Sequence, residues 1–251
     1  MAGMTDFAHA SSALTTSLNL MQPPVAISLT DTVPDGVATW TGASPAGCRF
    51  WQEAMHKTFA TAPRDHDLCA IGTYTHNLEG TEATNADLGL ALKVFADLTY
   101  VRDEDVAQIP VLSRRPKFVV YGPLAESPLA PDVVLLFVQA NQTLVLSEAA
   151  QQIDGGTTPA LGRPACAIVP QAANSGKAAL SLGCCGARAY LDVLTDEIAV
   201  FAIPGPKLET FTERIGALAK ANQILTRFHV VRQEQVASGA TPTVAQSLAA
   251  M

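Results

Sequence analysis

Several common signatures are missing from this chain of 251 residues. It contains no Gly-x-x-x-x-Gly-Lys-Ser/Thr loop, no Gly-x-Ser-x-Gly elbow and no His-Glu-x-x-His pair. The chain therefore lacks the sequence motifs that usually identify a phosphate-loop protein, an α/β-hydrolase and a zinc protease. No apolar run reaches the 18 or more residues that a membrane-spanning helix needs, so no membrane span is expected.

Basic charge is also scarce. The chain has 16 Lys and Arg against 23 Asp and Glu, which gives a formal net charge of −7. Nonspecific nucleic-acid binding depends on a basic face, so no nucleic-acid partner is expected. The first residues lack a basic segment followed by an apolar one, which predicts no signal peptide and a cytoplasmic protein.

Strand-like and helix-like segments are mixed along the chain. Short apolar runs predict strands at residues 25–29, 118–121, 132–138, 178–182 and 198–203. Apolar spacing predicts helices at residues 6–20, 46–59, 144–152 and 208–221, and one more that Asn85 caps. This mixture predicts an α/β or α+β fold, with a single mixed-sheet domain flanked by helices.

The expected domain spans residues 1–236. Residues 237–251 are rich in Ser, Gly, Ala, Thr and Pro, and they predict a loosely ordered C-terminal tail. The letters Cys-Ala-Ile occur at both Cys69 and Cys166, which is the basis for a weak internal two-fold repeat.

Five cysteines carry the chemical signal: Cys48, Cys69, Cys166, Cys184 and Cys185. An odd count without a signal peptide argues against structural disulfides. Gly, Pro, Arg or His stands close to each cysteine, as a ligand or a reactive thiol requires. Four separated thiolates suit an iron–sulfur cluster or zinc. Adjacent side chains diverge, so only one of Cys184 and Cys185 is expected to ligate, and Cys184 is preferred.

The absence of Cys-x-x-Cys pairs counts against structural zinc, so a 4Fe–4S cluster is expected before zinc. The predicted ligands are Cys48, Cys69, Cys166 and Cys184, with His66 and Arg188 tuning the cluster as neighbours of its ligands. The predicted function is therefore that of a cytosolic, cysteine-ligated iron–sulfur protein with a redox or cofactor-related role. Whether it is an enzyme is left open.

The residues leave two alternative functions open. In the first, the protein is a metal-free enzyme with Cys69 or Cys48 as nucleophile, and His66 or His76 as a nearby base. In the second, it is a non-catalytic module that binds a small molecule such as a tetrapyrrole. The expected partners are an electron-transfer protein or a small-molecule substrate, and the length and Ala-rich helices permit a homodimer.

A set of motifs in fixed order also resembles a known family, the prokaryotic domain-of-unknown-function 169 family. The motifs are Pro23-Pro24-Val25-Ala26, Cys48-Arg49-Phe50-Trp51, His66-Asp67-Leu68-Cys69-Ala70-Ile71-Gly72-Thr73-Tyr74-Thr75, Val119-Val120-Tyr121-Gly122-Pro123-Leu124, Pro131-Asp132-Val133-Val134, Gly183-Cys184-Cys185-Gly186-Ala187-Arg188, Asp196-Glu197 and Ile203-Pro204-Gly205. The resemblance implies family cysteines at Cys48, Cys69 and Cys184, and often one near Cys166. It also suggests an anaerobic or redox setting.

Overall fold

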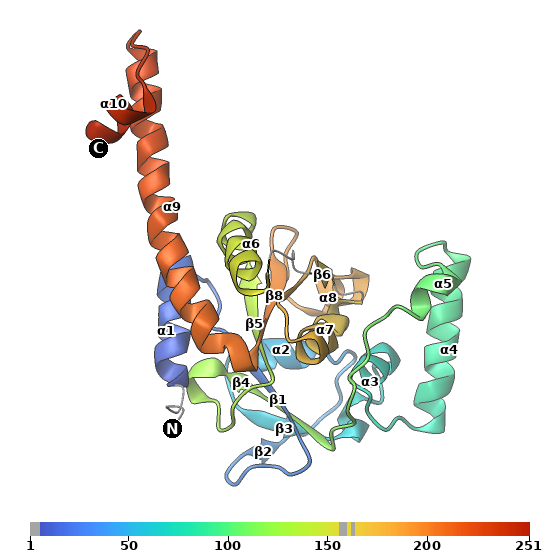
Figure 1. Cartoon of the computed structure of the whole chain (residues 1–251). Coiled ribbons are helices and arrows are strands. Elements are labelled where there is room, and N and C mark those ends of the chain that lie inside the picture. Colours follow the sequence, from blue (N-terminus) through green and yellow to red (C-terminus); the bar gives the residue numbers. More distant parts are fainter. Residues whose placement is uncertain (1–5, 156–159, 162–163) are drawn as a thin grey trace.

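The computed structural model describes residues 6–155, 160–161 and 164–251. One eight-stranded sheet runs through the molecule in the order β2-β3-β4-β1-β5-β8-β7-β6 (Figure 1). The described pairings are antiparallel except β2–β3 and β6–β7. The strands are β1 Val25–Thr30, β2 Ala38–Thr39, β3 Phe59–Thr61, β4 Phe118–Pro123, β5 Val133–Val138, β6 Ala160–Leu161, β7 Ala179–Ser181 and β8 Ala199–Pro204.

The central strands are apolar because helices cover both faces of the sheet. All six residues of β5 and all six of β8 are buried. Side chains alternate between the faces with the period of two expected of a strand. In β5, Val133, Leu135 and Phe137 pack into one core, and Val134 and Leu136 pack into the other.

Three long helices cover one face of the sheet. They are α1 Phe7–Leu18, α6 Ala140–Ile153 and α9 Leu208–Ala237. Short helices cover the opposite face, which we call the cysteine face because the cysteines lie on it. These are α2 Arg49–Glu53, α3 Ala70–Thr75, α7 Ile168–Ser175 and α8 Cys185–Tyr190, joined by the 3-10 turns η1 Pro63–His66 and η3 Ala165–Ala167.

Two parts extend away from the sheet (Figure 1). Helices α4 Glu82–Asp97 and α5 Asp103–Val106 lie beyond α3, and the C-terminal half of α9 projects on the other side of the molecule. Helix α10 Val244–Ala249 packs against this half of α9, where Ser247 is buried. Turns η2 Leu124–Glu126 and η4 Gly205–Lys207 follow β4 and β8.

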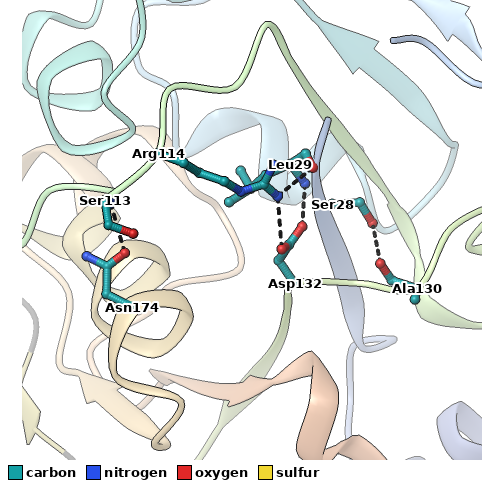
Figure 2. A network of polar contacts seen from close by, with 7 residues as sticks. All are labelled: Ser28, Leu29, Ser113, Arg114, Ala130, Asp132 and Asn174. Atoms are coloured by element: carbon teal, nitrogen blue, oxygen red, sulfur yellow. Dashed lines mark hydrogen bonds and ion pairs between the residues drawn. The ribbon is translucent and has the colours of Figure 1, made fainter. Parts of the chain in front are cut away.

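The segment that returns from α5 to β4 is tied down by side chains from elsewhere in the fold. The Arg114 guanidinium donates to the Leu29 carbonyl at 2.6 Å and to the Asp132 carboxylate at 3.0 Å (Figure 2). Asp132 also accepts the Leu29 N–H at 2.7 Å, and the Asn174 side chain of α7 accepts the Ser113 N–H at 3.0 Å. These contacts fix the approach to β4 and hold the C-terminal end of β1.

The structure confirms the α+β prediction of one mixed sheet flanked by helices. An internal repeat is not shown by the described residues, because Cys69 precedes α3 whereas Cys166 lies inside η3. The division at residue 236 stays a prediction. Among helices in the part of the chain that the structure describes, none has the length and apolar character that crossing a membrane requires.

Local details differ from the sequence expectations. Thr81, not Asn85, caps α4, since the Thr81 hydroxyl accepts the Thr84 N–H at 3.1 Å. The helix expected at residues 46–59 is only α2, and the chain then enters β3. That short strand forms because β4 pairs with it, a contact between segments nearly sixty residues apart.

Candidate functional site

Four cysteines lie where short elements begin on the cysteine face. Cys48, Cys69 and Cys184 directly precede α2, α3 and α8, and Cys166 lies in η3 before α7. Cys48 and Cys166 are buried in the core of this face, and Cys69 and Cys184 are partly buried against it. The structure therefore places four separate segments with cysteines on one side of the sheet.

Cys69 lies between two glycines. A Cβ atom on Gly72 would lie 2.8 Å from the Cys69 Sγ, and one on Gly47 would lie 3.9 Å from the same sulfur. The absence of side chains at these positions makes room for the thiol. Gly47 immediately precedes Cys48 in the sequence, so the Cys69 sulfur lies beside the turn that carries Cys48.

The two buried thiols stay protonated near neutral pH. Burial, and then the charges of Cys69 and Cys184, raise the pKa of Cys48 to about 12. Burial, and then the charge of Cys69, raises the pKa of Cys166 well above its ordinary value. The influence of Cys69 on both pKa values reflects its position near Cys48 and Cys166.

His66 is a buried neutral imidazole beside Cys69. It is only 1 % exposed, and burial, with the charge of His76, lowers its pKa to about 3. Its Nε2 lies 2.9 Å from the hydroxyl of Thr61, which itself donates to the Val119 carbonyl at 3.3 Å. Its Nδ1 has no hydrogen-bond partner among the described residues, although it is buried.

Two further buried polar atoms share this region. Burial lowers the pKa of His76 to about 4, although its Nδ1 contacts the Gly72 carbonyl at 3.1 Å. Burial, and then the charges of Cys166 and Cys69, raise the pKa of Tyr121. The Tyr121 hydroxyl and the His76 Nε2 both lack hydrogen-bond partners in the part of the chain that the structure describes. A buried polar atom without a protein partner calls for an explanation, such as a functional role or an ordered water molecule.

The predicted iron–sulfur function is wrong on this geometry. Among residues 6–155, 160–161 and 164–251, no three His, Cys, Asp or Glu side chains form a group that could hold a metal ion. The physical reason lies in the separate contacts of the thiols. Cys166 accepts a hydrogen bond from Thr75 at 3.4 Å, and Cys184 accepts the N–H of Ala187 in its own helix at 3.5 Å. Burial also opposes the thiolate form that a metal requires.

Arg188 has contacts other than those predicted for it. Its guanidinium donates to the carbonyls of Leu182, Thr195 and Ile198, which braces the loop between α8 and β8. Its role as a neighbour of a cofactor stays a prediction. Cys185 is exposed beside Tyr100, whose pKa is raised by burial and by the charge of Cys185.

Sequence reasoning missed Thr61. Nothing in the local sequence marks it, because its role depends on β3 pairing with β4. Gly47 and Gly72 were visible next to Cys48 and Cys69, but only the fold shows that both face one sulfur. His76 was noted as a neighbour of Cys69 in sequence, and the structure places its ring 6.3 Å from that of His66.

Comparison with known proteins agrees with the motifs. The family described as uncharacterised ArCR, domain-of-unknown-function 169, matches residues 13–214. An uncharacterized protein of Methanocaldococcus jannaschii, MJ0308, is 28 % identical over 211 residues, which cover 78 % of this chain and 88 % of that protein. No solved structure matches. The match over residues 13–214 places most of the fold, including all five cysteines, inside the family region, and the chain therefore belongs to the domain-of-unknown-function 169 family.

Proposed function

We propose that this protein performs thiol–disulfide redox chemistry, with Cys69 as the reactive thiol and Cys48 as its disulfide partner. The observation that carries the proposal is the setting of Cys69. It is partly exposed near two buried thiols, and its sulfur lies beside the turn that begins at Gly47. A small disulfide can reach Cys69, whereas Cys48 and Cys166 are shielded from it.

The reaction has two exchange steps. In the first, the Cys69 sulfur bonds to one sulfur of a small disulfide R–S–S–R, whose own S–S bond breaks, and one RSH leaves. In the second, the Cys48 sulfur attacks Cys69, the mixed disulfide breaks and the second RSH leaves. Overall, two protein thiols are oxidised to one disulfide, and the small disulfide is reduced to two thiols. Each protein thiol gives its proton to a departing RS group.

Burial favours this order of steps, because Cys48 is buried whereas Cys69 is partly exposed. Burial is also the largest cause of the raised pKa of Cys48, so the second step is the slower one. We expect the mixed disulfide on Cys69 to be observable before Cys48 resolves it.

The setting that suits this chemistry is a reducing one, because disulfides in the cytoplasm are commonly transient and redox-linked. We therefore place the protein in the cytoplasm, with a low-molecular-weight disulfide as substrate or a redox protein as electron partner. A homodimer stays a prediction.

The test uses a Cys185→Ser background, because Cys185 is exposed and would react independently. The protein is treated with one equivalent of dipyridyl disulfide, and its peptides are mapped by mass spectrometry. We expect a Cys48–Cys69 disulfide. Adding Cys48→Ser should stop the reaction at the mixed disulfide on Cys69.

Cys184→Ser is the matched control, because Cys184 is a partly buried thiol of the same face that the reaction does not use. In the Cys185→Ser background it should leave the Cys48–Cys69 disulfide unchanged. A disulfide between any other pair, or an unreactive Cys69, contradicts the proposal.

A further inference from the structure

A buried base faces the space beside the Cys69 thiol. A Cβ atom on Gly47 would lie 3.2 Å from the His66 Nδ1 and 3.9 Å from the Cys69 Sγ. Both atoms therefore border the same small space, which exists because position 47 carries no side chain. The imidazole nitrogen has no partner among the described residues there, and the histidine is almost fully buried.

The contacts on the far side of the ring bear on which nitrogen carries the proton. The Thr61 hydroxyl has a single hydrogen, and its oxygen lies 2.9 Å from the His66 Nε2 and 3.3 Å from the Val119 carbonyl oxygen. When the hydroxyl donates to the Val119 carbonyl, its oxygen is the acceptor for Nε2–H, and the Nδ1 presents a free lone pair.

We propose that His66 Nδ1 accepts the proton of the Cys69 thiol as that sulfur attacks a disulfide, and that Thr61 is the positioning residue that holds the required tautomer. This inference rests on the proposed thiol–disulfide function and adds the base for its first step. It assigns a role to a buried imidazole nitrogen that has no structural partner in the described part of the fold.

The step balances as follows. The S–H bond of Cys69 breaks, its proton passes to Nδ1, and its electron pair forms the bond to one sulfur of R–S–S–R. The S–S bond of the reagent breaks, and its electron pair leaves on RS, which takes the proton back from His66. The products are the mixed disulfide on Cys69 and one RSH, with His66 neutral again.

The resting state follows from the same burial. Burial disfavours the charged imidazolium, so His66 rests neutral. In the proposed step, proton transfer is coupled to the attack, as in general base catalysis.

The test measures how fast dipyridyl disulfide modifies Cys69 and Cys185 in the same molecule, with each thiol followed by peptide mass spectrometry. His66→Gln should slow Cys69 by about 100-fold, the lower end of the usual range for general base catalysis. Cys185 lies on the surface and should keep its wild-type rate, which makes it an internal control for folding.

Two substitutions of Thr61 test whether its hydroxyl is needed for the reaction of Cys69. Thr61→Val keeps the shape of the buried side chain but removes the acceptor for Nε2–H, so Cys69 should slow again. Thr61→Ser keeps the hydroxyl and should restore a rate close to that of the wild type, which a purely structural role of the methyl group would not predict.

The outcomes separate the two proposals. A wild-type protein in which Cys69 does not react overturns the proposed redox function itself. A reactive Cys69 whose rate is unchanged in both His66→Gln and Thr61→Val overturns only the role of His66. Parallel slowing of Cys185 in the variants, or failure of Thr61→Ser to restore the rate, also counts against this role.

Discussion

Mild acid should destabilise this protein through its two buried histidines. His66 is 1 % exposed and His76 is 3 % exposed, and both are neutral in the folded state. Burial lowers the pKa of His66 to about 3 and that of His76 to about 4, from an ordinary value of 6.5. The unfolded chain therefore binds more protons than the folded one as the pH falls below 6.5.

The sign and size of the effect follow from this difference. The stabilisation is fully present above about pH 6.5, and it is lost progressively as the pH falls toward the folded pKa values. At pH 5 both histidines are still neutral when folded and largely protonated when unfolded. Each then contributes a loss of about 2 kcal/mol, and the pair about 4 kcal/mol, in the free energy of unfolding relative to pH 7.

The assay is urea unfolding followed by far-ultraviolet circular dichroism at pH 7 and at pH 5. This interval lies above the ordinary pKa values of Asp and Glu, so carboxylates contribute little to the difference. His66→Gln and His76→Gln should each remove about half of the loss, and the double variant most of it. His56→Gln is the matched control because His56 is exposed.

Two results would refute this reasoning. One is an unfolding free energy in the wild type that does not fall between pH 7 and pH 5. The other is a double variant that loses as much stability as the wild type over the same interval. The second result would mean that other groups cause the acid sensitivity, whatever the histidines do.

Four substitutions test local contacts of the fold. Gly72→Ala should slow modification of Cys69, because the new Cβ would lie 2.8 Å from its sulfur; a wild-type rate contradicts this geometry. Gly205→Ala should lower the unfolding free energy by roughly 3–5 kcal/mol in a urea titration, since its Cβ would meet a backbone carbonyl. Gly89→Ala, where the space is open, should be neutral or stabilising by up to about 1 kcal/mol, and a loss there would undermine the comparison. Asp132→Ala should cost about 1–3 kcal/mol in the same assay by leaving a β1 N–H without its acceptor.

The sequence predicted the central sheet well because its strands are short apolar runs between turn residues. Residues 133–138 are buried on both faces of the sheet, and a strand of this kind appears in the sequence as a continuous apolar run. Element ends were less predictable. Asn85 and Thr81 are both residues that cap helices, and the position of α4 against α3 favours Thr81.

The sequence singled out the cysteines but not their tertiary contacts. Local sequence placed Cys48 and Cys166 near the starts of helices, and in the structure Cys48 directly precedes α2 and Cys166 lies in η3 before α7. Spacing could not reveal that the thiols fail to form a metal-holding group within the described residues. The direction of a side chain depends on the packing of its whole element, and neighbours in sequence do not fix it.

The sequence by itself determined the α+β class, the apolar strands and the set of cysteines with permissive neighbours. Only the tertiary structure decided that Cys69 is partly exposed near two buried thiols, and that the Thr61 hydroxyl lies 2.9 Å from the His66 Nε2. The reason is that burial and hydrogen bonding are properties of contacts between distant segments. Residues 61 and 119 meet because β3 pairs with β4, and that pairing brings the Thr61 hydroxyl beside the buried imidazole.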